Sequence, residues 1–438
     1  MIRRVVYWGL DFLKGSPVRR HLRELESAFR DPDATLALTR QRTRALIDHA
    51  CHTTDYYRQF LGAKELSEFP VLQKRTVKEH YDEFFSSVYE RSSLVPVKTS
   101  GSYGTPLTFY LTKEKKARQR AEVIYFSGWA GYEIGDRHAY VRSTSTKGKG
   151  TLTLFMQNEV VMRASVLDEE WLERERQLLL HGGIEVFIGF PYVIVALAEY
   201  CRTKGDTPSS FHLKAIITMA ESLNERARET LHQIFGCPVL SRYATEEFGV
   251  LAHECRLFAE CDRMSHHHLN IASYLVEVLS LEGDKPVSPS EVGRVVVTDP
   301  FSHAMPLIRY DTGDLAALGG ICPCGLPGPT LQRLEGRTVE EVFGTDGQRI
   351  SPFTISGTLK ELDDIVQFQF VQQGDKTYEL RLVTLPSFHQ KKQARQCLLD
   401  VLGADAELKL SYVEQIPPLP SGKRPFVINE WRRREETG

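Results

Sequence analysis

The feature that most constrains the fold is a strand–helix–strand rhythm that begins near residue 180. Short apolar runs rich in β-branched residues alternate with helical stretches, one ending at Lys204 and one over 226–235 with a capping-box pair, Ser222 and Glu225, before it. Alternation of this kind is typical of a parallel sheet covered by helices. The expected strands are 184–188, 213–219 and 238–243.

Beyond residue 270 the pattern changes. Two β-rich runs, 274–280 and 293–299, are expected to pair antiparallel. After about 339 a smaller α+β piece follows, with strands at 365–371, 377–383 and 408–413 and a helix at 387–402. The fold class is therefore α/β, with mixed and parallel sheets in a large N-terminal domain, 1–336, and a small C-terminal α+β domain, 337–438. Residues 1–90 form a helical lead-in.

Composition excludes several classes of protein. Hydrophobic residues make up 42% and charged residues 26% of 438, which is typical of a globular chain. A formal net charge of −2 predicts no nucleic-acid partner. Eight scattered cysteines without a secretion signal favour reduced thiols and a cytoplasmic protein.

The N-terminus has a basic start followed by apolar residues, as signal peptides have. Asp11 and Lys14 interrupt the apolar stretch, and no small-residue cleavage site follows. No run approaches the ~20 apolar residues of a transmembrane segment. We expect a short amphipathic helix that packs on the body of the protein, with packing on a membrane surface as the alternative.

Three motifs are candidates for ligand binding. The first is a small, hydroxyl-rich loop over 99–106, which could wrap phosphates with backbone N–H groups but lacks the Lys of a P-loop. The second, Tyr243-Ala244-Thr245-Glu246, follows an expected strand, and Glu246 could hold magnesium. The third is the run 309–314, Arg-Tyr-Asp-Thr-Gly-Asp, in which Asp314 after the Gly turn could accept ribose hydroxyls. Plain turns and a surface carboxylate are the alternatives.

Two further motifs come later in the chain. Gly336-Arg337 lies at the expected domain boundary, and Pro420-Ser421-Gly422-Lys423 lies near the C-terminus. A lysine in a small glycine loop is usually just solvated, so Lys423 matters only if its loop can reach a phosphate.

In this order and at these spacings, the five motifs resemble those of the adenylate-forming superfamily. The chain looks most like the phenylacetate–coenzyme A ligases and the capsular-polysaccharide (CapK-like) and coenzyme F390 synthetase-like proteins. Tyr-x-Thr-Glu and Arg-Tyr-x-Thr-Gly-Asp, about sixty residues apart, are the most specific part of the resemblance.

The resemblance implies a role for each matching residue. Catalysis would fall to Lys423, Glu246 and Thr245, with Thr245 touching phosphate, Glu246 holding magnesium and Lys423 carried by a mobile C-terminal domain. The remaining nucleotide-binding residues would be Ser100, Gly101, Ser102, Gly104 and Pro106 in the phosphate loop, Ala220, Glu221 and Tyr243 near adenine, Asp314 on ribose and Arg337 at the domain junction.

The chain departs from the family pattern at three places. The phosphate loop has Tyr103 where Thr is usual and Thr105 where Lys is usual, and Val339, followed by Glu340, stands where the hinge often has Asp. Adenylation remains the expectation, whereas hinge mechanics and the second half-reaction are less secure.

A set of cysteines and histidines suggests a metal. Cys322-Pro323-Cys324-Gly325 is a tight knuckle, and upstream lie Cys255, Cys261 and the triplet His266-His267-His268. Thiolate and imidazole suit tetrahedral zinc, although one residue between paired cysteines is shorter than usual. By resemblance the ligands would be Cys255, His268, Cys322 and Cys324, with Cys261 as the spare. Four protein ligands would make the zinc structural, and reduced, unliganded cysteines are the alternative.

The resemblance implies an AMP-forming acid–thiol ligase. ATP and magnesium would activate a small-molecule carboxylic acid as an acyl-adenylate, with release of pyrophosphate, and coenzyme A would be the favoured acceptor. An amine or hydroxyl acceptor, and a non-catalytic nucleotide-binding relative, are the alternatives. The sequence does not identify the acid, and it leaves a homodimer open.

Overall fold

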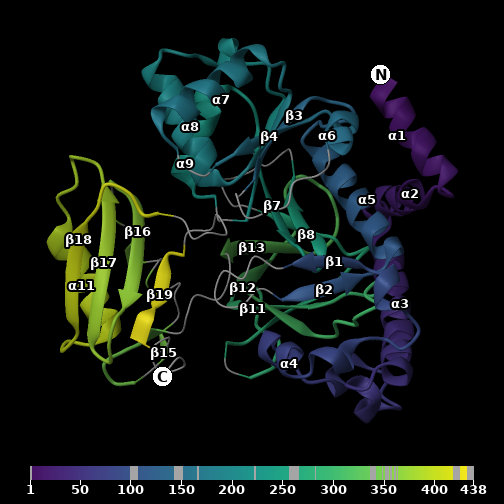
Figure 1. Cartoon of the computed structure of the whole chain (residues 1–438). Coiled ribbons are helices and arrows are strands. Elements are labelled where there is room, and N and C mark those ends of the chain that lie inside the picture. The colour runs from purple at the N-terminus through teal and green to yellow at the C-terminus, as the bar shows by residue number, and fades with distance from the viewer. Residues whose placement is uncertain are drawn as a thin grey trace. The chain divides into compact units, whose positions relative to one another are not determined.

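The chain divides into two compact units, Met1–Gly336 and Arg337–Gly438 (Figure 1). The computed structural model describes residues 2–98, 107–142, 151–164, 167–220, 223–255, 266–281, 283–335, 342–347, 349–350, 355, 358–359, 362, 364–417 and 425–431. The expected α/β class, with a large sheet unit and a small α+β unit, is confirmed by this architecture.

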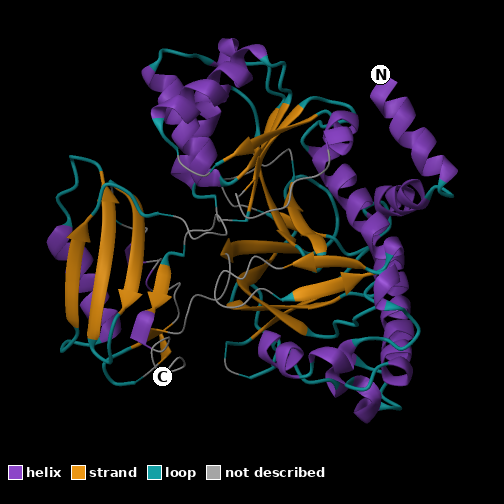
Figure 2. Ribbon diagram, viewed as in Figure 1, coloured by secondary structure: helices purple, strands orange, loops and turns teal. Residues whose placement is uncertain are grey.

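Eleven described strands of the first unit form one sheet, in the order β10-β11-β12-β13-β9-β8-β7-β6-β5-β3-β4 (Figure 2). Its parallel part contains the apolar runs expected from the sequence, and three helices, α7, α8 and α9, lie beside it (Figure 1). The elements are β3 (His138–Arg142), β4 (Glu159–Arg163), α7 (Glu169–His181), β5 (Val186–Gly189), α8 (Pro191–Thr203), β6 (Ala215–Met219), α9 (Glu225–Phe235) and β7 (Val239–Thr245).

The expected capping box before α9 is wrong. Asn224 is the N-cap residue, and its side chain accepts a hydrogen bond from the Ala227 N–H. Asn is as good an N-cap as Ser, and it stands one residue before the helix, at the position where its oxygen reaches the third N–H.

From β7 onward the sheet continues antiparallel. As expected, β10 and β11 pair, with Leu275 opposite Thr298. The strands are β8 (Gly249–Glu254), β9 (His267–Leu269), β10 (Leu275–Leu279), β11 (Val292–Thr298), β12 (Tyr310–Gly319) and β13 (Thr330–Glu335). A large apolar core lies under this part and includes Tyr243, Phe248 and Tyr310.

Helices dominate the first hundred residues. They are α1 (Ile2–Leu13), α2 (Pro17–Ala28), α3 (Pro32–Thr53) and α4 (Lys74–Glu79), followed by the small pair β1 (Val95–Lys98) and β2 (Thr108–Leu111), then α5 (Lys113–Trp129) and α6 (Thr151–Gln157). Within the described residues, each helix is too short or too polar to cross a membrane.

The second unit has its own core and sheet. Four of its described strands form a sheet in the order β18-β17-β16-β19, and β14 and β15 form a separate pair. Phe370, Tyr378, Leu380 and Leu398 are among its buried residues. The elements are β14 (Val342–Phe343), β15 (Arg349–Ile350), β16 (Ile365–Gln372), β17 (Thr377–Thr384), α11 (Lys391–Leu402), β18 (Glu407–Tyr412) and β19 (Val427–Asn429). The expected hairpin is the antiparallel pair of β16 and β17.

Helix α5 carries charged side chains into the interior of the first unit. Lys115, Arg118 and Glu122 lie on one side of the helix, at spacings of three and four, and all three are fully buried. Lys115 forms an ion pair with the equally buried Asp299, with Nζ and Oδ2 2.7 Å apart. Arg118 Nη1 donates to Glu24 Oε1 over 2.9 Å, which ties α2 to α5.

The same helix holds the turn between β7 and β8. Gln119 Nε2 donates to the carbonyl oxygens of Glu246, at 3.3 Å, and Phe248, at 2.9 Å. Glu122 Oε2 accepts the Val250 N–H at 3.1 Å, and burial raises the pKa of Glu122. These hydrogen bonds from α5 therefore fix the backbone around Glu246.

Gly249 is the tightest point of this turn. Its φ is +119°, which L-residues rarely adopt, and a Cβ there would lie 2.3 Å from Glu122 Oε2. We expect Gly249→Ala to destabilise the protein by at least about 2 kcal/mol more than Gly205→Ala, since Gly205 shares a positive φ (+78°) but a Cβ there meets nothing within 4 Å. Urea and thermal unfolding of both variants measure this, and equal losses would contradict the close-packing argument.

Candidate functional site

Two of the predicted nucleotide-side residues that the structure describes, Ala220 and Glu246, stand where the parallel strands end. Strands β6 and β7 are parallel neighbours, with Met219 opposite Arg242. Ala220 follows β6, and Glu246 follows β7, so both stand at the carboxyl edge of the sheet, where α/β folds bind ligands. Glu246 is exposed, and Ala220 has a φ of +68°, a strained conformation for a residue other than glycine.

A hydrogen bond joins this edge to the antiparallel part of the sheet. Tyr243 Oη of β7 donates to Asp314 Oδ2 of β12 over 2.6 Å, and both residues are buried. Burial and the neighbouring Asp314 carboxylate hold the pKa of Tyr243 well above its usual value, so the hydroxyl keeps its proton. The two most specific sequence motifs thus contact one another directly.

Asp314 does not follow a turn, as the sequence suggested, but lies inside β12. Gly313, with a φ of +74°, and shifts in the pairing of β12 with both its neighbours mark an irregularity there. A glycine in the left-handed region within a strand is typical of a bulge, which re-aims the next side chain. The strand thereby keeps its pairing and still turns Asp314 toward Tyr243.

The two carboxylates of this motif differ in their partners. Arg294 Nη1 lies 2.8 Å from Asp311 Oδ2, and Gln73 donates to the same oxygen over 3.1 Å. Asp311 is thus neutralised by the protein itself, whereas among the described residues the side-chain partner of Asp314 is the neutral hydroxyl of Tyr243. Asp314 is therefore the better hydrogen-bond acceptor for a ligand. Arg309 serves the fold, because it pairs with Glu277 and donates to the Phe69 carbonyl.

Several supporting residues had no signature in the sequence. Gln119 and Glu122 hold the turn from α5, and Tyr274 Oη lies 2.5 Å from the Phe248 carbonyl oxygen. Arg242, next to Tyr243, is buried; its Nη2 donates to Ser127 Oγ over 2.7 Å, and burial lowers its pKa to about 10. Polar residues spaced along one side of 115–122 were the sequence signal for these contacts. The signal does not identify the partners, because they come from distant segments.

Four predicted metal ligands do converge. The Cys255, Cys322 and Cys324 thiols and the His268 ring place one ligand atom each within 4.8 Å of the others. Cys255 Sγ lies 3.7 Å from Cys322 Sγ, and Cys324 Sγ lies 3.3 Å from His268 Nε2. Tetrahedral zinc with Zn–S bonds of about 2.3 Å separates its sulfur ligands by roughly 3.8 Å, so the spacing fits.

The surroundings of the cluster also suit a cation. The Leu326 N–H donates to Cys324 Sγ over 3.4 Å. Burial, then the neighbouring Cys324 and Cys322, raise the pKa of Cys255, so its thiol would lose the proton only with a positive charge beside it. Burial lowers the pKa of His268 to about 4, which leaves its ring neutral and able to bind a metal. The other described cysteines, Cys51, Cys201, Cys237 and Cys397, are free.

The remaining predicted residues lie outside the part of the chain that the structure describes. They are Ser100, Gly101, Ser102, Gly104, Pro106, Glu221, Arg337 and Lys423, together with the spare cysteine, Cys261. Thr245 is described, and its hydroxyl accepts the Phe248 N–H over 3.2 Å.

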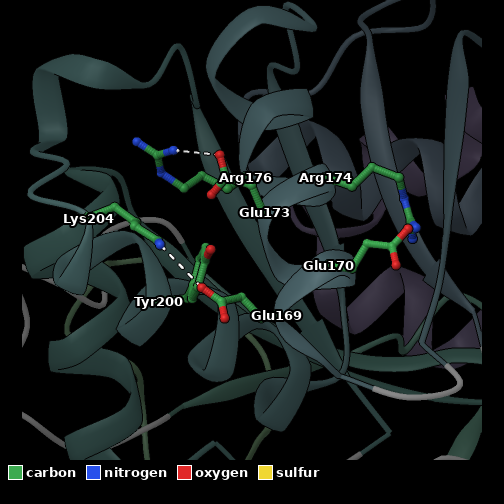
Figure 3. A pocket seen from close by; sticks show the side chains of 7 residues that line it. All are labelled: Glu169, Glu170, Glu173, Arg174, Arg176, Tyr200 and Lys204. Atoms are coloured by element: carbon green, nitrogen blue, oxygen red, sulfur yellow. Dashed lines mark hydrogen bonds and ion pairs between the residues drawn. The ribbon is translucent and has the colours of Figure 1, made fainter.

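A hollow between α7 and α8 is a poor candidate for the site (Figure 3). Its charges pair with one another: Arg176 with Glu173 at 3.0 Å, and Lys204 with Glu169 at 3.4 Å. Mutual pairing of exposed charges is typical of a solvated helix surface. The lining residues are Glu169, Glu170, Glu173, Arg174, Arg176, Tyr200 and Lys204.

Comparison with known proteins gives relatives over nearly the whole chain. The CapK C-terminal domain model matches residues 342–430. Protein CapK of Staphylococcus aureus is 21% identical, covering 96% of this chain and 95% of that protein. The phenylacetate-coenzyme A ligase of Thermus thermophilus is 25% identical, covering 78% and 79%.

Solved structures share the fold. A crystal structure of 2-hydroxyisobutyryl-CoA ligase in complex with 2-HIB-AMP has a TM-score of 0.70 at 18% identity and covers 91% of each chain. ATP-bound MatB from Rhodopseudomonas palustris has a TM-score of 0.55 at 17% identity, covering 78% of this chain and 68% of that one. The resemblance expected from the sequence motifs is confirmed: the chain carries a CapK C-terminal domain, is a relative of CapK and the phenylacetate–coenzyme A ligases, and has the fold of adenylate-forming CoA ligases.

Proposed function

We propose that the chain is an AMP-forming acid–thiol ligase that activates a carboxylic acid with ATP and then transfers the acyl group to coenzyme A. The observation that carries the proposal is the buried Tyr243–Asp314 pair beside Glu246, at the carboxyl edge of the parallel strands. The relatives, phenylacetate–coenzyme A ligases among them, support this chemistry.

In the first half-reaction, a carboxylate oxygen of the acid bonds to the α-phosphorus of ATP, and the bond to the β-phosphate oxygen breaks, releasing pyrophosphate. Asp314 accepts ribose hydroxyls while Tyr243 holds its other oxygen, and Thr245 lies beside the phosphates. Glu246 would hold magnesium, which would neutralise charge on the phosphate oxygens. The hydroxyl-rich loop and Lys423 supply donors to the developing charge.

In the second half-reaction, the thiol of coenzyme A attacks the acyl carbon, and AMP leaves.

The resemblance to CapK-like proteins keeps an amine or hydroxyl acceptor as the second candidate. A non-catalytic nucleotide-binding protein is a rival, but a site that had lost its chemistry would not be expected to keep a buried Asp314 that has no cationic partner among the described residues. The identity of the acid and a homodimer stay open, and the free cysteines agree with a cytoplasmic location.

We also propose that Cys255, His268, Cys322 and Cys324 bind one structural zinc ion. With four protein ligands the ion has no open position for substrate. Bound there, it would join the end of β8 to β9 and to the loop before β13, all within the first unit.

The reaction itself gives the first test of the proposal. Purified protein supplied with ATP, magnesium, coenzyme A and a panel of carboxylic acids should release pyrophosphate and AMP with at least one acid. Glu246→Gln should slow this by about 10²-fold, because a neutral amide holds magnesium weakly, and higher magnesium should partly restore the rate. Glu170→Gln, on the exposed surface of α7, is the matched control. ADP and phosphate as products would rule out the reaction, and equal rates for the two variants would rule out the role of Glu246.

Zinc binding is tested by elemental analysis. Protein purified without chelator should contain about one zinc per chain, and Cys322→Ser should lose it and unfold more readily, because binding free energy is folding free energy. Cys397→Ser, which alters a free cysteine of the second unit, should keep the metal. Metal-free wild-type protein with unchanged stability after chelation would reject the site.

Lys423 should act in one half-reaction only. Removing one positioned charge from a developing oxyanion costs ~10²–10³ in rate, so Lys423→Ala should slow acyl-adenylate formation by about that factor. Thioester formation from a supplied acyl-adenylate should stay near wild type, since no bond to the α-phosphorus forms or breaks in that step. Single-turnover kinetics of each half measure this, with Lys392→Ala on α11 as the control. Equal loss in both halves would assign Lys423 to folding instead.

A further inference from the structure

Helix α1 is amphipathic, but unlike an ordinary surface helix it turns its apolar side away from the protein. Its polar side faces the protein: Asp11 is buried and accepts the N–H groups of Val18 and Arg19 at 3.1 and 3.0 Å, and the Arg3 guanidinium lies 4.8 Å from the ring centre of Phe155. Arg3, Tyr7 and Asp11 are four residues apart and so share one side of the helix.

The other side of α1 is apolar and exposed. Around a helix of 3.6 residues per turn, its large apolar residues cover one continuous arc that includes Gly9. The exposed fractions are 80% for Ile2, 67% for Val5, 39% for Val6, 47% for Leu10, 74% for Phe12 and 80% for Leu13. Phe155 of the neighbouring α6 is 62% exposed. Single exposed apolar residues need no explanation, but a contiguous set of this size marks an interaction surface.

Positive charge accompanies this apolar arc. Residues 2–30 contain seven Lys and Arg but three Asp and Glu, a net charge of +4, so the rest of a chain whose total is −2 carries −6. Two of the three acids are engaged internally, Asp11 at the start of α2 and Glu24 with Arg42 and Arg118. Lys14, which directly follows Leu13 of the arc, and Arg19 and Arg23 of the next helix, α2, are exposed.

The charge decides between the surfaces that could cover the arc. A second copy docked through α1 would bring two segments of net positive charge together, and these would repel one another, even with Arg4 paired to Glu133 and Arg20 to Glu114. An anionic lipid bilayer offers an apolar layer beneath negatively charged headgroups, which matches both features of α1. In Figure 1, α1 lies at the margin of the first unit, beyond α2 and α6, where a flat surface can reach it.

We propose that α1 binds the surface of anionic membranes, with the arc of Ile2, Val5, Val6, Phe12 and Leu13 inserted among the acyl chains and Lys14, Arg19 and Arg23 at the headgroups. This inference does not depend on the proposed ligase activity. It places the protein at a membrane through α1, whose 12 residues are too few to span a bilayer.

Vesicle sedimentation tests the proposal with the full-length chain. Wild-type protein is mixed with vesicles of phosphatidylcholine alone, or of phosphatidylcholine and phosphatidylglycerol at about 3:1. We expect binding to the anionic vesicles at least about tenfold tighter than to the neutral ones, and weaker binding as salt rises. Failure of the wild-type chain to bind anionic vesicles at low salt would overturn the proposal.

Variants separate the apolar from the charged contribution. Val5→Ser/Phe12→Ser should weaken binding by roughly tenfold or more per side chain, whereas Leu61→Ser/Val88→Ser, at exposed apolar residues elsewhere (59% and 63% exposed), should leave it unchanged. Lys14→Glu/Arg23→Glu should weaken it by roughly tenfold or more, unlike Arg40→Glu/Lys392→Glu, which changes the net charge equally.

Two controls keep the result decisive. Circular dichroism and thermal unfolding report folding without relying on enzymatic activity, and the variants should match wild type because the changed side chains are exposed. Light scattering reports the oligomeric state. A wild-type dimer that Val5→Ser/Phe12→Ser converts to a monomer would assign the arc to a second copy. Equal vesicle binding by that variant and its control would also overturn the proposal.

Discussion

The buried charges of α5 are the constraint on which the rest of the first unit depends. Lys115, Arg118 and Glu122 are fully buried, and each is matched by a partner from a different segment: Asp299 after β11, Glu24 on α2, and the Val250 N–H of β8. A buried ion pair adds little net stability, but leaving one charge unpaired costs about 3–5 kcal/mol. The network therefore selects one arrangement of these segments more than it strengthens the fold. The Glu246 turn rests directly on it, through Gln119 and Glu122.

The periodic parts of this architecture were readable from the sequence. The apolar runs that form β5, β6 and β7, and the hairpin of β16 and β17, are patterns within short segments. The sequence of each segment is therefore enough to indicate them. The cap of α9 was misassigned to Ser222, because Ser222 and Asn224 are both good caps and only the backbone decides between them. Asp314 was expected after a turn, since Gly within a short motif does not distinguish a turn from a bulge in a strand.

The sequence predicted residues of the candidate site only where a short motif contains them. Glu246, Asp314 and the four metal ligands were each named from the sequence, and the structure brings Tyr243 to Asp314 and Cys255 to Cys322. The residues that orient them were not predicted. Gln119 donates a hydrogen bond to a turn about 130 residues further along the chain, and Arg294 pairs with Asp311 and so leaves Asp314 available. Contacts across such separations leave no periodic trace. They follow from the order of the strands, which no single segment encodes.

Polar contacts also set the orientation of α1. Turning the helix by half a revolution would bury Val5 and Phe12, but it would remove Asp11 from the N–H groups of Val18 and Arg19, which begin α2. Helix α2 is in turn fixed to α5 by Glu24 and Arg118, so it cannot follow. The turned helix would place Asp11 in solvent and leave these first N–H groups of α2 without their acceptor, since Ser16 makes no side-chain cap. The polar contacts of the fold thus set which side of α1 faces outward, and they leave its apolar arc exposed.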